Sequence, residues 1–168
     1  GYFNKGVWDR LSIDGWKGLP QNFINEFAVL FDARNPKPVP SRFGEDHSMI
    51  GDKEGMTALG KNRNEYLSVD TEGFCNAATN IMEGMENINP MSFLLVAHAA
   101  FEEVTRRNEE RVTNKHLCFY HIHNPDHYTQ ANFLRYATDA RILMIVREPV
   151  ENCQSWIRSF IEENNYEQ

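Results

Sequence analysis

Hydrophobic positions in the first two thirds of the chain recur mainly at helical spacing. One side of residues 20–33 is apolar when drawn as a helix, and Pro20 suits the first turn of that helix. Residues 72–86 and 90–109 predict two further helices, and the second opens with a proline, as the first turn of a helix often does. Residues 34–64 keep no period and are rich in proline, glycine and charge. We therefore expect a long loop there, with at most one short helix around 53–61.

The last third of the chain alternates strand-like and helix-like segments. Residues 115–122 have strand composition, and residues 126–138 predict a helix. Residues 141–147 are a mostly apolar run, typical of a strand whose two faces are both covered, and residues 149–164 predict an amphipathic helix. Short links between such segments favour parallel strands and right-handed crossovers. We therefore expect an α/β fold, with a parallel sheet flanked by helices.

Length and composition indicate one globular domain. The chain has 168 residues, of which 41% are hydrophobic and 12% aromatic. We expect a single domain, 1–168, in which 1–110 form a mainly helical and loop layer and 111–168 a β-α-β-α nucleotide-binding part. The net charge of −7 argues against a general nucleic-acid binder but leaves room for a local anion site.

Cysteine usage and hydropathy suggest a cellular location. Cys75, Cys118 and Cys153 are widely spaced and form no CxxC pair, so we expect reduced, mostly buried thiols in a cytoplasmic protein. No apolar run approaches the length of a membrane span, and the N-terminus lacks the apolar core of a signal peptide. A secretory-pathway origin stays open if the chain is a piece of a longer protein.

Two segments follow the predicted strands, where ligands bind in open α/β sheets. One is HIHNP at 121–125 and the other is REP at 147–149. A guanidinium at Arg147 has the planar fork that suits phosphate or sulfate oxygens. The helix predicted to start at Pro149 adds free N–H groups and a positive dipole end, and Ser155 adds a hydroxyl away from the apolar stripe.

These features together predict a phosphate cradle. In the competing interpretation, Arg147 pairs with Glu148 or Glu151, and Ser155 is only solvated. The stripe from which Ser155 is excluded consists of Val150, Cys153, Trp156, Ile157, Phe160 and Ile161.

The run ARILMIVREPVENCQSW at 140–156 resembles the 3′-phosphate-binding segment of the PAPS-dependent sulfotransferases. That segment is an apolar strand, then Arg-x-Pro, then a serine eight positions after the arginine. HIHNP is similar to the family's Lys-Thr-His-x-Pro segment, and His123 stands at the catalytic-base position, 24 residues before Arg147. The resemblance covers about 111–160.

The resemblance implies a P-loop NTPase-like sulfotransferase fold and sulfuryl transfer from PAPS to a hydroxyl or amine acceptor. His123 would be the general base, and Arg147 and Ser155 would bind the 3′-phosphate of the cofactor. No metal is implied. The acceptor would be a small molecule or a carbohydrate whose identity the sequence does not indicate.

The chain departs from this family in three places. It contains no glycine-rich lysine loop such as GxxGxxK or KxGTT for the 5′-phosphosulfate, and no C-terminal basic loop after 160. His121 replaces the usual lysine before the catalytic histidine. We therefore expect a fold that is incomplete at both ends, with half a cofactor site and no assured activity in isolation. The exposed sheet edge predicts a homodimer.

Two other functions fit parts of the pattern. His121 and His123 would share one face of a strand and, with Asp126 and His127, could chelate a metal in a hydrolase. Alternatively, the chain is a non-catalytic nucleotide- or partner-binding module, in which 1–110 supply a helical interface.

Overall fold

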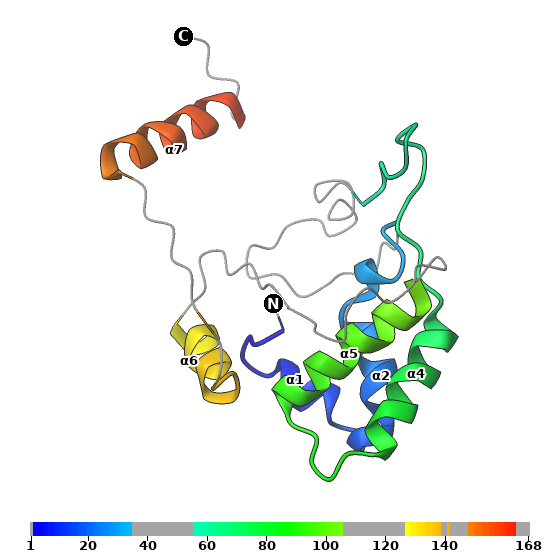
Figure 1. The fold of residues 1–168 in the computed structure, drawn as a ribbon. Coiled ribbons are helices and arrows are strands. Elements are labelled where there is room, and N and C mark those ends of the chain that lie inside the picture. Colours follow the sequence, from blue (N-terminus) through cyan, green and yellow to red (C-terminus); the bar gives the residue numbers. More distant parts are fainter. Residues whose placement is uncertain (1, 35–55, 106–126, 139–140, 142–147, 164–168) are drawn as a thin grey trace. The chain divides into compact units, whose positions relative to one another are not determined.

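The computed structural model describes residues 2–34, 56–105, 127–138, 141 and 148–163. Its elements are α1 (Val7–Leu11), α2 (Gly15–Glu26), the 3-10 turn η1 (Ala28–Leu30), α4 (Thr71–Glu83), α5 (Pro90–Thr105), α6 (His127–Tyr136) and α7 (Pro149–Glu163) (Figure 1). The chain divides into two compact units, 1–138 and 139–168. Each unit is described by itself.

The expected parallel α/β sheet is wrong for this structure. Its described residues are helices and turns with no strand, and their β-pairing is limited to two isolated antiparallel bridges, Asp32–Ser68 and Leu59–Glu65. The P-loop NTPase-like sulfotransferase fold is overturned by the same finding. The segments 115–122 and 142–147, on which the sheet depended, lie outside the described residues. The homodimer prediction depends on an exposed edge of the sheet. Without a sheet, that structural reason for a homodimer no longer applies.

Most of the helices expected from periodicity are confirmed. The segments predicted at 72–86, 126–138 and 149–164 correspond to α4, α6 and α7, each within three residues at either end. α5 begins at Pro90 as predicted and is described as far as Thr105. Residues 56–64 hold turns, a bend and the bridge at Leu59 but no helix, and residues 35–55 of the predicted loop lie outside the described part.

The helix predicted at 20–33 is displaced toward the N-terminus. α2 already begins at Gly15 and ends at Glu26, and the chain continues as η1. Pro20 consequently lies inside the helix rather than in its first turn. A proline there removes one backbone hydrogen bond. Its ring is fully buried in the core, which offsets part of that cost.

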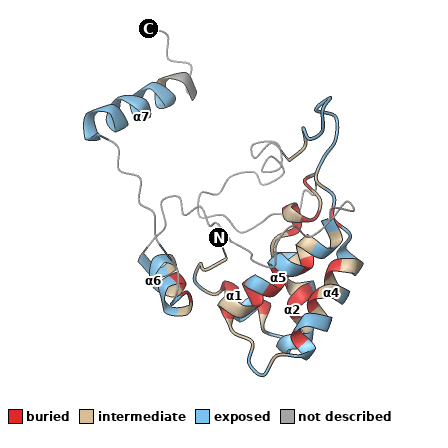
Figure 2. Ribbon diagram, viewed as in Figure 1, coloured by how far each residue is buried: buried red, intermediate tan, exposed pale blue. Residues whose placement is uncertain are grey.

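The core of the first unit is aromatic and joins α2, α4 and α5. Phe74 of α4 lies 5.9 Å from Phe23 of α2 and 5.0 Å from Phe101 of α5, measured between ring centroids. Phe31, just after η1, lies 4.9 Å from both Phe74 and Phe101. Figure 2 shows buried residues on the sides where these helices face one another. This part of the chain therefore buries its apolar surface by packing helix on helix.

Side chains fix where the central helices begin. Asp70 caps α4, because its Oδ1 accepts the Gly73 N–H at 3.0 Å. Before α5, the Oδ1 of Asn89 accepts the N–H groups of Met91 at 2.9 Å and Ser92 at 3.0 Å. The Ser92 Oγ in turn accepts the Asn89 N–H at 2.8 Å. Reciprocal bonds of this kind satisfy helix-start donors that have no partner within the helix.

Helix α6 belongs to the first unit and packs on the N-terminal residues. Phe133 is buried and meets Phe3 edge to face, with ring centroids 5.4 Å apart. The Thr129 hydroxyl donates to the Asn4 side chain at 2.8 Å, and the Asn132 amide donates to the Phe3 carbonyl at 3.3 Å. The start of the chain is thus held against a helix more than a hundred residues away in sequence.

In the second unit, the described structure is mainly the amphipathic helix α7. Four large residues of its apolar stripe are 60–70% exposed: Val150, Trp156, Ile157 and Phe160. No helix in the described ranges is long and apolar enough to cross a membrane.

Candidate functional site

Of the three predicted site residues, the structure describes only Ser155. His123 and Arg147 lie outside the described residues, so their distance from Ser155 is not defined. Ser155 lies in the second turn of α7 and is exposed. The proposed pairing of Arg147 with Ser155 around one phosphate therefore stays a prediction.

Helix α7 starts where the sequence predicts, but fewer of its first backbone N–H groups are free to bind an anion than expected. The helix begins at Pro149, two residues after Arg147. Pro149 has no N–H, and the Glu151 N–H donates to the Glu148 carboxylate, with 3.0 Å between N and Oε2. The Asn152 N–H donates to the Glu148 carbonyl at 3.0 Å. Neither of these two hydrogen bonds involves the N–H of Val150, which also lies in the first turn.

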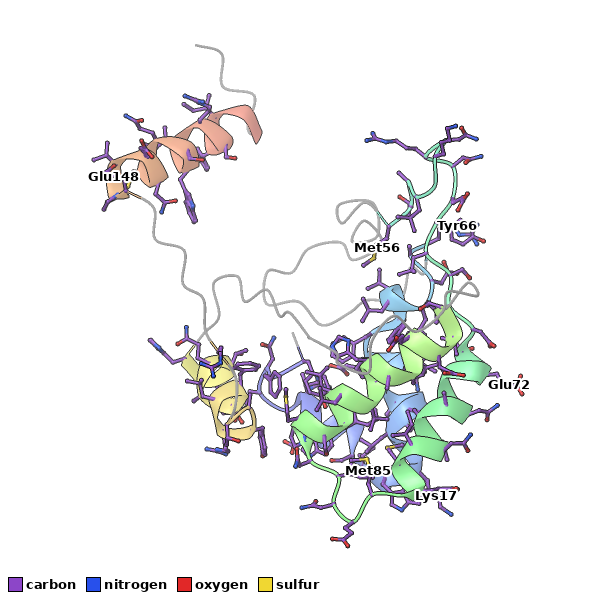
Figure 3. All side chains as sticks on the ribbon, viewed as in Figure 1. Lys17, Met56, Tyr66, Glu72, Met85 and Glu148 are labelled. Carbon is purple, nitrogen blue, oxygen red and sulfur yellow. The ribbon has the colours of Figure 1, made fainter. Side chains whose placement is uncertain are left out.

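Glu148 is therefore the residue that the sequence reasoning missed. Its place at the start of α7 is labelled in Figure 3. In the competing interpretation Glu148 is a partner of Arg147, which lies outside the described residues; in the structure the Glu148 carboxylate accepts a backbone N–H of the helix. Glutamate is not among the usual N-cap residues. The weak signal in the sequence is that Glu148 directly precedes Pro149, because proline often occupies the first helical position.

Ser155 lies on the polar side of α7, as predicted. Residues three and four apart are neighbours on a helix surface, so Glu151 and Asn152 precede it by one turn, and Arg158 and Ser159 follow it by one turn. All four are exposed. An anion that accepts a hydrogen bond from the Ser155 hydroxyl would have an amide donor and a carboxylate on one side and a guanidinium on the other.

The metal hypothesis is not tested by this structure. His127 opens α6 and is exposed, while His121, His123 and Asp126 lie outside the described residues. Among the residues that were described, no group of three or more His, Cys, Asp or Glu side chains is placed to hold a metal ion.

The other chemically distinctive groups differ in their surroundings. Cys75 in α4 is half-buried, and burial raises the pKa of its thiol, which disfavours the reactive thiolate. Cys153 in α7 is exposed, so the prediction of a buried thiol is wrong for this residue. Cys118 lies outside the described residues. In α5, partial burial lowers the pKa of His98 and favours its neutral form.

Searches of family models, curated proteins and solved structures found no match to this chain.

Proposed function

We propose that this chain carries the 3′-phosphate-binding part of a PAPS-dependent sulfotransferase, which transfers a sulfuryl group to a hydroxyl or amine acceptor. The observation that supports the proposal is the start of α7. The helix begins two residues after Arg147 and carries Ser155 on its exposed polar side. The proposal requires the Arg147 and Ser155 side chains to reach one phosphate, and the described helix start between them is compatible with that requirement.

Each predicted residue has a distinct role in this proposal. The Arg147 guanidinium and the Ser155 hydroxyl donate hydrogen bonds to the ribose 3′-phosphate and so position the cofactor. His123 accepts the proton of the acceptor group, because the pKa of an ordinary imidazole lies near neutrality. PAPS supplies the sulfuryl group, and no metal takes part.

The remaining assignments belong to the same proposal. The acceptor is a small molecule or a carbohydrate, and the partner is not nucleic acid, because the net charge of −7 disfavours general binding to phosphate backbones. The reaction takes place in the cytoplasm. The isolated chain binds the nucleotide through half of the site, and turnover requires the missing 5′-phosphosulfate loop.

Nucleotide binding tests the proposal. Calorimetric titration should show that adenosine 3′,5′-bisphosphate binds at least about tenfold more tightly than adenosine 5′-monophosphate, because only the former carries the 3′-phosphate. Arg147→Ala should remove this preference by a loss of about tenfold or more, and Ser155→Ala should cost about three- to tenfold. Arg135→Ala is the matched control, since Arg135 is an exposed arginine at the end of α6.

Other outcomes point to the other functions. Weak binding that is insensitive to Arg147→Ala would contradict the proposal and favour a non-catalytic module. Binding or hydrolysis that requires zinc or manganese and is abolished by a chelator would favour the metal hydrolase.

His123→Ala should leave nucleotide affinity nearly unchanged, because the proposed base does not contact the phosphate.

A further inference from the structure

Part of the apolar stripe of α7 has the spacing of a seam between two helices. The α7 seam consists of Val150, Cys153, Ile157 and Phe160, which follow one another at steps of three, four and three residues. Residues spaced in this way occupy the a and d positions of a coiled coil, where each faces a second helix. All four are exposed, three of them at 60–61% (Figure 2). In the described part of the second unit, α7 is the only helix, so no other helix covers the seam.

We propose that a second copy of this chain covers the α7 seam, with the two α7 helices paired antiparallel about Ser155. In this register, Val150 of one copy lies opposite Phe160 of the other, because both positions are five residues from Ser155. Cys153 lies opposite Ile157, because both are two residues from Ser155. Each layer of the seam then joins a smaller side chain to a larger one, which lets the two surfaces interdigitate. The seam is therefore complementary to itself.

The charges of α7 favour a protein partner over a lipid surface. The helix sequence holds three glutamates and one arginine. Helices that lie on a membrane surface instead carry lysine and arginine on their polar side. Next to the centre of the seam, the described neighbours Gln154 and Trp156 are both uncharged. A second copy therefore meets no repulsion between like charges at these two positions.

The pairing goes beyond the proposed function and does not rest on it. Ser155 lies on the side of α7 opposite the seam and is exposed, so a dimer leaves that side of both helices accessible. The seam is only about 15 Å long, since each helical residue rises about 1.5 Å. We therefore expect a weak, reversible dimer with a dissociation constant of about 10–100 μM. Nucleotide titration at lower concentrations reports on the monomer, so the failure of one proposal does not decide the other.

Sedimentation equilibrium of the full chain from about 5 to 500 μM measures the association. The average mass of the wild type should rise from the 19.5 kDa of one chain toward twice that mass. Ile157→Asp buries a carboxylate in the seam and should weaken the association by at least about tenfold. Ser159→Asp is the matched control, because it adds the same side chain on the exposed polar side of the same helix, and it should leave the association unchanged. Circular dichroism checks that both variants keep their helix content.

Cross-linking tests the register without adding a charge, and it decides the question if Ile157→Asp unfolds α7. In the antiparallel register, Ile157→Cys places a thiol opposite Cys153 of the second copy. Mild oxidation should therefore form a disulfide between Cys153 and position 157 of two different chains, which peptide mapping identifies. Parallel pairing would instead link Cys153 to Cys153, and that product would overturn the proposed register.

A wild type that stays monomeric up to about 500 μM would overturn the proposal, and so would a dimer that Ile157→Asp does not weaken. The other possible covers of the seam give distinct results. A monomer in which Cys153 resists alkylation would show that the chain itself covers the seam. A monomer that binds phosphatidylglycerol vesicles would assign the seam to a lipid surface. Either result would refute pairing through α7.

Discussion

Truncation of Phe74 should destabilise the helical unit more than any surface change on the same helix. The Phe74 side chain is fully buried, and its ring lies 4.9 Å from Phe31, 5.0 Å from Phe101 and 5.9 Å from Phe23 between centroids. Phe74→Ala therefore leaves a cavity between α4, α5 and the segment of α2 and η1. Substitutions of this kind cost about 3–5 kcal/mol. Three ring contacts are lost together, which places the expected value in the upper half of that range.

The measurement is urea unfolding followed by far-ultraviolet circular dichroism. A loss of about 4 kcal/mol is a large share of the roughly 5–15 kcal/mol by which domains are usually stable, so the midpoint should move markedly. Ile81→Ala is the control, because Ile81 lies on the same helix and is 40% exposed, and it should cost about 1 kcal/mol or less. Equal losses for the two variants, or a loss below about 1.5 kcal/mol for Phe74→Ala, would refute the aromatic core described here.

Two further predictions concern a cap and a titrating group. Asp70→Ala removes the acceptor of the Gly73 N–H and should lower the free energy of unfolding by about 1 kcal/mol. Asp70→Asn keeps a side-chain oxygen and should retain most of the wild-type stability. Equal losses in the two variants would exclude capping by Asp70. Burial lowers the pKa of His98 below its usual value of 6.5. As the pH falls, the unfolded chain therefore binds a proton at this imidazole before the folded chain does. The stability that is present above about pH 6.5 consequently declines as the pH falls. Between pH 7.5 and 5.5, the urea midpoint of the wild type should therefore fall further than that of His98→Gln, and parallel curves would contradict this reasoning.

Local patterns in the sequence were sufficient to locate most helices. The 3.6-residue period, the proline at the start of α5 and the proline at the start of α7 each act within one or two turns, and these helices begin where predicted. The polar position of Ser155 on α7 follows from the same period. Such features depend on neighbours in the chain, so no knowledge of the fold was needed.

Predictions that needed partners distant in sequence were less successful. The parallel sheet was inferred from apolar runs, but a short apolar run does not by itself distinguish a strand from a buried helical segment, and a sheet exists only if separate strands pair. Pro20 was placed in a first turn because proline favours that position, yet α2 extends before it and buries its ring in the core. The exposure of Cys153 likewise depends on what covers α7, which its own sequence does not specify.

By itself, the sequence determined the amphipathic helices, the charge balance and the spacing of the arginine and the serine on which the sulfotransferase proposal depends. Only the tertiary structure decided that the described core is built from helices packed through phenylalanine rings. The physical reason is the distance along the sequence over which each of these features acts. Periodicity and spacing are properties of neighbouring residues, whereas the partner of a buried ring is chosen by where the whole chain places its competing groups.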